Sequence, residues 1–112
     1  MMVAFFDPGQ MTARLDIEAP QPFADGQGGA TLIWQVLASV WARIEPVSFV
    51  VAEDEAAAQT GTISHRIWLR FRDDVVAGQR LRKGMRVFTI KLVRDPDETR
   101  RYLVCQCEED AR

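Results

Sequence analysis

Cysteine and histidine are scarce in this 112-residue sequence, which contains only Cys105, Cys107 and His65 of these two types. The two cysteines lie two positions apart on an expected strand, so their side chains face the same way, without favourable geometry for a disulfide. A zinc site of the usual kind lacks ligands, because there is no second cysteine pair and no second histidine. We therefore expect no metal, no cofactor, a cytoplasmic setting, and cysteines that pack in the core or at its rim.

Long apolar runs are also missing, since none approaches the roughly 20 residues that cross a bilayer. An apolar patch within residues 1–8 is too short for a secretory signal, and no basic residue precedes it. No Gly-rich phosphate loop, metal-ligand cluster or nucleophile motif occurs either. The sequence therefore predicts one small domain that is not an enzyme, is not exported and does not span a membrane.

The net charge of −2 argues against a protein that coats nucleic acid through bulk electrostatics. The charges are nevertheless unevenly distributed, with an acidic segment followed by a basic region. The acids are Glu45, Glu53, Asp54 and Glu55, and the basic residues are Arg66, Arg70, Arg72, Arg80, Arg82, Lys83, Arg86, Lys91 and Arg94. Such separation favours self-association, in which the acidic part of one copy meets the basic part of the next. A chance charge run on a solvated surface is the alternative.

Apolar and polar residues alternate in several short segments, which is the pattern of half-buried strands. We expect strands at residues 12–18, 40–47, 63–72, 85–93 and 100–108. Residues 20–29 contain Pro20, Pro22 and several glycines, which we expect to break regular structure. Residues 31–39 are apolar without a clear helical or strand period, and we interpret them as extended chain with room for a helical turn. We interpret residues 80–84 as a turn. The fold class is all-β, a small antiparallel barrel or sandwich, with the barrel favoured.

The connection between the second and third of these strands is unusually long, covering residues 46–61. Strands in small all-β domains are usually joined by about 2–5 residues, and longer insertions are commonly functional or disordered. Residues 53–59 also have good helix propensity, with acids at the start. We place the candidate functional loop here, with Ser48, Phe49, Glu53, Asp54, Glu55 and Gln59 as its candidate residues.

The segment 63–72 alternates most clearly, and it places His65 on the core side as a structural histidine. Its opposite face carries Arg66, Trp68, Arg70 and Arg72, and Trp41 faces outward on the preceding strand. We interpret these five residues as a subunit or partner interface. The alternative is a small-barrel module that binds single-stranded nucleic acid through the same arginines and Trp68. Against it stand the small net charge and the single aromatic residue on that face.

Several blocks, in this order and spacing, resemble the phage head–tail adaptor family, also called head-closure or stopper proteins. They are Asp25-Gly26-Gln27-Gly28-Gly29 followed by Trp34, the segments 40–46, 62–72 and 84–90, Asp95-Pro96-Asp97, and Tyr102-Leu103-Val104-Cys105. Each block alone is weak, but together they cover residues 12–108. The resemblance implies a β-barrel domain at 12–108, preceded by an N-terminal arm at 1–11 and followed by a C-terminal tail at 109–112.

The resemblance also implies a structural role in a tailed phage or in a domesticated, phage-derived particle such as a gene transfer agent. The expected assembly is a six- or twelve-fold homo-oligomeric ring at the particle neck, assembled in the bacterial cytoplasm. The expected partners are the portal or adaptor protein above, a tail terminator or tail protein below, and double-stranded DNA in the channel. In this family a long loop between barrel strands projects toward the channel and closes it, and residues 46–61 match that loop. Its acids would repel DNA phosphates and lower friction during passage. The alternatives are that these acids contact a neighbouring subunit or remain solvated.

Overall fold

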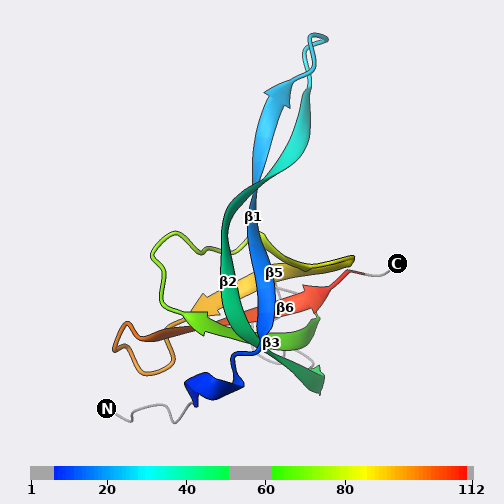
Figure 1. Ribbon diagram of the computed structural model, residues 1–112. Coiled ribbons are helices and arrows are strands. Elements are labelled where there is room, and N and C mark those ends of the chain that lie inside the picture. The colour runs from blue at the N-terminus through cyan, green and yellow to red at the C-terminus, as the bar shows by residue number, and fades with distance from the viewer. Residues whose placement is uncertain (1–6, 51–61, 111–112) are drawn as a thin grey trace.

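A computed structural model describes residues 7–50 and 62–110 of the chain. After a short 3-10 helix, η1 (Pro8–Gln10), these residues form six strands (Figure 1). The strands are β1 (Ala13–Ala24), β2 (Ala30–Val50), β3 (Ile63–Arg70), β4 (Arg80–Lys83), β5 (Arg86–Arg94) and β6 (Tyr102–Glu109). Within the described part of the chain, no helix is long and apolar enough to cross a membrane.

The strands form one closed barrel with the neighbour order β1-β2-β3-β6-β5-β4, and every pairing is antiparallel. Closure occurs between β1 and β4, where Ile17 pairs with Leu81 and Glu18 pairs with Arg80. A closed sheet has no open edge strands, so the barrel itself offers no edge for pairing with another chain. The prediction of an all-β fold with a small antiparallel barrel is confirmed.

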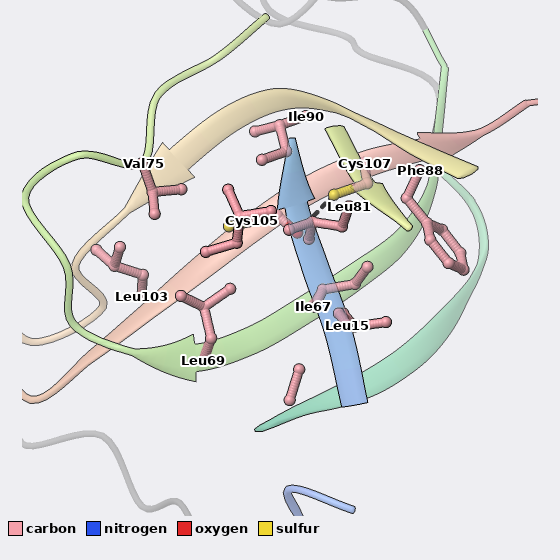
Figure 2. Packing of buried hydrophobic residues seen from close by; sticks show 12 residues of the cluster. Leu15, Ile67, Leu69, Val75, Leu81, Phe88, Ile90, Leu103, Cys105 and Cys107 are labelled. Atoms are coloured by element: carbon pink, nitrogen blue, oxygen red, sulfur yellow. Dashed lines mark hydrogen bonds between the residues drawn. The ribbon is translucent and has the colours of Figure 1, made fainter. Parts of the chain in front are cut away.

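The barrel is filled by the inward-facing side chains of all six strands (Figure 2). The buried cluster consists of Leu15, Ile17, Ala42, Ile67, Leu69, Val75, Leu81, Phe88, Ile90, Leu103, Cys105 and Cys107. The alternation predicted for residues 63–72 is confirmed, because Ile67 and Leu69 are buried and Arg66 and Arg70 are exposed. Removing this apolar surface from water is the main force that holds the barrel together.

His65 lies at the edge of this core, as the sequence predicted. Its ring packs edge-on against Phe88, with a centroid distance of 5.1 Å, and its Nδ1 lies 2.8 Å from the Ser64 hydroxyl. Burial lowers the pKa of His65, and the positive charge of Arg86 lowers it further, although the Glu109 carboxylate acts in the opposite direction. The histidine is therefore an uncharged packing residue at neutral pH whose ring nitrogen Nδ1 has a hydrogen-bond partner.

The prediction that residues 20–29 break regular structure is wrong for residues 20–24 and right for residues 25–29, which form the turn between β1 and β2. Strand β1 continues to Ala24, and Pro20 and Pro22 lie within it, opposite Trp34 and Leu32 of β2. Antiparallel pairs alternate between bonded and non-bonded positions, so prolines two residues apart occupy positions of the same kind. Because proline has no N–H, both fit the non-bonded positions, where their nitrogens face away from β2 and the ladder stays intact.

Residues 31–39 are extended, as expected, but the helical turn that we allowed for is absent, because these residues belong to β2 and pair with β1. The two strands are joined by a turn that Asp25 stabilises. Its carboxylate Oδ1 accepts hydrogen bonds from the backbone N–H groups of Gln27 and Gly29, at 2.8 and 3.1 Å. Gly26 and Gly28 adopt positive φ angles of 79° and 85°, which side chains disfavour.

Residues 80–83, which we expected in a turn, form β4 instead. The chain reverses just after them, at Gly84, whose φ of 61° suits a tight hairpin turn. Residues 48–50, assigned from the sequence to the long connection, continue β2 beyond the expected strand 40–47. Pro46 pairs with His65 and Val50 with Ile63, with an irregularity in the pairing between them. Residues 51–61 of that connection lie outside the described residues.

The two cysteines are free and fully buried, which agrees with a packing role. Burial raises the pKa of the Cys105 thiol to about 12 and also raises that of Cys107. Because the thiolate is the reactive form, we expect neither thiol to react with a disulfide reagent such as Ellman's reagent in native protein at pH 8. After denaturation both should react at once. Rapid reaction of either thiol without denaturant would contradict the buried arrangement.

Candidate functional site

A two-stranded hairpin projects from the barrel and is its most prominent surface feature (Figure 1). Beyond Glu18, β1 no longer pairs with β4, and before Ala42, β2 does not yet pair with β3. Residues 19–37, here called the projecting hairpin, therefore extend past the closed barrel. The molecule consequently measures 52 Å along its longest axis but only 32 and 28 Å along the other two.

The projecting hairpin is apolar and almost uncharged. Asp25 is its single charged residue, and that carboxylate is occupied by the turn. Large apolar side chains on it are well exposed: Phe23, Leu32, Ile33, Val36 and Leu37. Contiguous exposed apolar surface is uncommon on monomeric proteins and generally marks an interaction site.

The two faces of the projecting hairpin differ in composition. Residues paired across an antiparallel ladder point to the same face, so the register assigns each side chain to a face. One face carries only apolar residues, namely Pro20, Pro22, Ala24, Ala30, Leu32, Trp34 and Val36. The other combines Phe23 and Ile33 with the polar Gln21, Thr31 and Gln35. The first of these is here called the apolar face.

Charged residues fasten the base of the projecting hairpin to β4. Glu18 is buried, with 6% of its surface exposed, and its carboxylate accepts hydrogen bonds from Nε of Arg80 at 2.6 Å and of Arg82 at 3.2 Å. The Arg80 guanidinium also stacks over the Trp34 ring, with Cζ 4.0 Å from the ring centroid. A partly buried carboxylate paired with two guanidinium groups is a strong, directional contact. The hairpin is thus anchored on the barrel rather than freely hinged.

The five residues predicted as an interface lie on one outward surface but line two different depressions. Trp41, Arg70 and Arg72 line a cavity of about 310 Å³, here called the Trp41 pocket, together with Met11, Arg14, Ser39, Val40 and Phe71. Arg66 and Trp68 line a wider, open hollow with Val93, Arg94, Asp95, Pro96, Asp97, Glu98, Val104 and Gln106. The Trp41 ring is 53% exposed, and the Arg14 guanidinium lies 5.2 Å from its centroid.

Carboxylates of the same chain neutralise part of the predicted basic face. Arg72 forms a bidentate pair with Asp74, at 3.0 and 2.9 Å, and this hydrogen bonding lowers the pKa of Asp74. Arg66 lies 3.7 Å from Glu45, which also pairs with Arg43 at 3.4 Å. The observed pairs therefore weaken the nucleic-acid alternative, and they show that Glu45 has basic partners within its own chain.

Of the predicted loop residues, Ser48 and Phe49 lie in β2, and Glu53, Asp54, Glu55 and Gln59 lie outside the described residues. Sequence analysis missed the projecting hairpin entirely. The available signal was the Asp-Gly turn at 25–26 between two long stretches without charge. Among residues 7–50 and 62–110, no group of three or more metal-ligating side chains is arranged to hold an ion.

We expect replacement of Glu18 by alanine to destabilise the protein by about 1–3 kcal/mol, because two guanidinium groups would lose their carboxylate partner. The environment of Trp34 should change as well, since Arg80 stacks on it. Denaturant unfolding and tryptophan fluorescence measure these effects. Glu108→Ala is the matched control: Glu108 pairs with Lys91 at 3.7 Å on the surface, and its loss should cost at most about 1 kcal/mol. Equal effects of the two substitutions would contradict an anchoring role for Glu18.

A model of the phage head completion protein family matches residues 6–110. Among solved structures, a chain in the virion of a native gene transfer agent particle is 29% identical, with a TM-score of 0.65, covering 90% of this chain and 96% of that chain. Protein SF1141 from Shigella flexneri 2a is 26% identical, with a TM-score of 0.71, covering 95% of this chain and 98% of its own. Comparison with curated proteins gave no match.

The family match runs from before η1 to the end of β6 and thus includes the whole barrel and the projecting hairpin. The resemblance derived from the sequence blocks is confirmed, including the relation to a gene transfer agent particle. The chain belongs to the phage head completion protein family.

Proposed function

We propose that this protein is a head–tail connector, or stopper, that forms a ring between the portal or adaptor complex and the tail. The ring closes the DNA channel and offers the surface on which the tail docks. The observation that carries the proposal is the family match over residues 6–110. The similarity to a chain from a gene transfer agent virion, which covers 90% of this chain, supports it. The role is structural rather than catalytic.

The barrel suits such a role because it is a closed, well-packed scaffold from which the projecting hairpin extends. Strand β2 is continuous from the projecting hairpin, through the barrel, to Val50, where the connection 51–61 begins. Six- or twelve-fold cyclic symmetry would repeat each feature around a central channel. The hydrogen-bonded pairing of the barrel strands would fix the position from which the connection starts in each copy.

The acids of the connection supply the proposed interaction with DNA. Glu53, Asp54 and Glu55, repeated around a ring, would create a negative potential in a narrow channel. Phosphates would be repelled at distances comparable to the Debye length, about 8 Å at physiological ionic strength. DNA could then move past the connection without adhering to it, and closure would depend on steric contact rather than on binding.

The proposed partners are further copies of the chain, the portal or adaptor protein above, a tail terminator or tail protein below, and the double-stranded DNA. The proposed location is the neck of a virion or phage-like particle, assembled in the cytoplasm of the bacterial host. We do not favour binding of single-stranded nucleic acid, because Arg66 and Arg72 are paired with carboxylates of their own chain.

We expect the triple substitution Glu53→Gln, Asp54→Asn, Glu55→Gln to change DNA retention or particle assembly, because it removes the acids proposed to face the DNA. Nuclease-protected DNA per particle measures retention, and electron microscopy measures assembly. Asp73→Asn is the matched control, since it removes an exposed acid outside the connection.

Image reconstruction of particles that carry the wild-type chain tests the location directly. Density for the chain at the neck is the expected result. Its absence there, or a chain that never joins particles, would refute the proposed function.

A further inference from the structure

The projecting hairpin has features that its role in the barrel does not explain. It adds little to the core, because none of its residues belongs to the buried cluster. Its apolar face exposes 60% of Leu32 and 50% of Val36. In water this exposed apolar surface is unfavourable, at about 25 cal/mol for each Å², and its burial by a partner would be correspondingly favourable.

Several observations restrict the chemistry of that partner. The hairpin carries no Lys or Arg and its only acid is used by the turn, so it lacks the cationic side chains that dominate binding to DNA phosphates. Addition of a strand along the β1 edge is also unfavourable, because Pro20 and Pro22 provide no outward N–H groups. The apolar face therefore fits a protein surface with an apolar depression.

The same chain provides such a depression at the opposite end of β1. The Trp41 pocket combines apolar side chains, Met11, Val40, Trp41 and Phe71, with arginine side chains. Arg14 in this pocket is 11 residues from Asp25 at the hairpin turn, which corresponds to roughly 36 Å at about 3.3 Å per residue. Because β1 and β2 are paired along this length, a hairpin cannot fold back onto its own pocket.

We infer that the apolar face of the projecting hairpin docks on the Trp41 pocket of a second copy of this chain. This inference rests on the proposed ring, and it names the surfaces that join its subunits. A closed ring requires two different, complementary patches on every subunit, and the hairpin and the pocket meet this requirement. The molecule's long axis of 52 Å against widths of 32 and 28 Å leaves the hairpin long enough to lie across a neighbouring barrel.

Polar groups complement this contact. Leu32 and Trp34 occupy the positions opposite the prolines, so their carbonyl groups face the open edge of the hairpin. Arg70, which has no ion pair with the described residues, lines the pocket and can donate hydrogen bonds to such carbonyls. The contact would then bury the exposed leucine and valine and give these carbonyl groups a hydrogen-bond donor.

Two kinds of measurement on the purified full-length chain test the inference. Mass photometry and sedimentation over a concentration series should show self-association of the wild type. Leu32→Asp and Trp41→Asp should each weaken it at least tenfold, because each places a charge in the apolar contact. Circular dichroism and thermal melting establish that the variants remain folded.

Two controls separate this contact from a general effect of added charge. Gln35→Asp places an acid on the other face of the same hairpin, and Val76→Asp replaces a similarly exposed apolar residue, 54% exposed, away from it. Both should associate within about twofold of the wild type. Loss of association in either control, equal to that of Leu32→Asp, would overturn the assignment of the apolar face.

Cross-linking identifies the contact, since the native thiols are buried and only introduced ones should react. Protein with Leu32→Cys is mixed with protein carrying Met11→Cys and treated with a short bis-maleimide. A heterodimer between the two is expected. Homodimers of Leu32→Cys alone, or a wild type that gives no self-association at millimolar concentration, would overturn the inference.

The outcomes also separate this inference from the proposed function. Rings that still form with Leu32→Asp would refute the docking contact and leave the connector role intact. If rings of the Leu32→Asp variant form but no longer bind another particle protein, the hairpin binds that protein rather than a second copy of this chain, and the docking inference is wrong. A chain absent from the particle neck would refute the connector role whatever the hairpin binds.

Discussion

Closure of the barrel depends on a short pairing between β1 and β4, in which Asp16, Ile17 and Glu18 face Arg82, Leu81 and Arg80. This pairing brings Ile17 and Leu81 into the core and leaves no open edge on the barrel. It also ends at Glu18, whose carboxylate binds both arginines of β4. The same three positions therefore close the barrel and define where the projecting hairpin begins.

Most of the barrel could be predicted from the sequence because its longer strands have one buried face, whereas the four-residue strand β4 was expected as a turn. Alternation is informative only under that condition, and it correctly assigned Ile67 and Leu69 to the core and Arg66 and Arg70 to the surface. The same alternation correctly placed His65 on the core side of its strand. The strand boundaries were less accurate, since residues 46–50 continue β2 past the last clearly alternating residues.

The projecting hairpin could not be predicted by the same reasoning, because both of its faces are exposed and burial imposes no period on it. Pro20 and Pro22 then appeared to be breakers, although proline is compatible with non-bonded positions of a ladder. Residues 31–39 showed no clear period, so they were interpreted only as extended chain with room for a helical turn. Whether an apolar side chain is buried in its own domain or left exposed for a partner depends on tertiary packing, which one sequence does not reveal.

The contacts of the charged residues change the physical basis for self-assembly. The sequence favoured association between an acidic segment and a basic region, yet Arg66, Arg72, Arg80, Arg82 and Arg86 all pair with carboxylates within the chain. Charges already paired contribute less to attraction between copies, since a new contact must replace an existing one. Among residues 7–50 and 62–110, no side chain covers the exposed apolar surface of Leu32 and Val36, so this surface is the stronger candidate for holding copies together. Because β2 runs from that surface into the barrel and pairs regularly with β3 from Ala42 to Pro46, a docked hairpin would also fix the orientation of this part of β2.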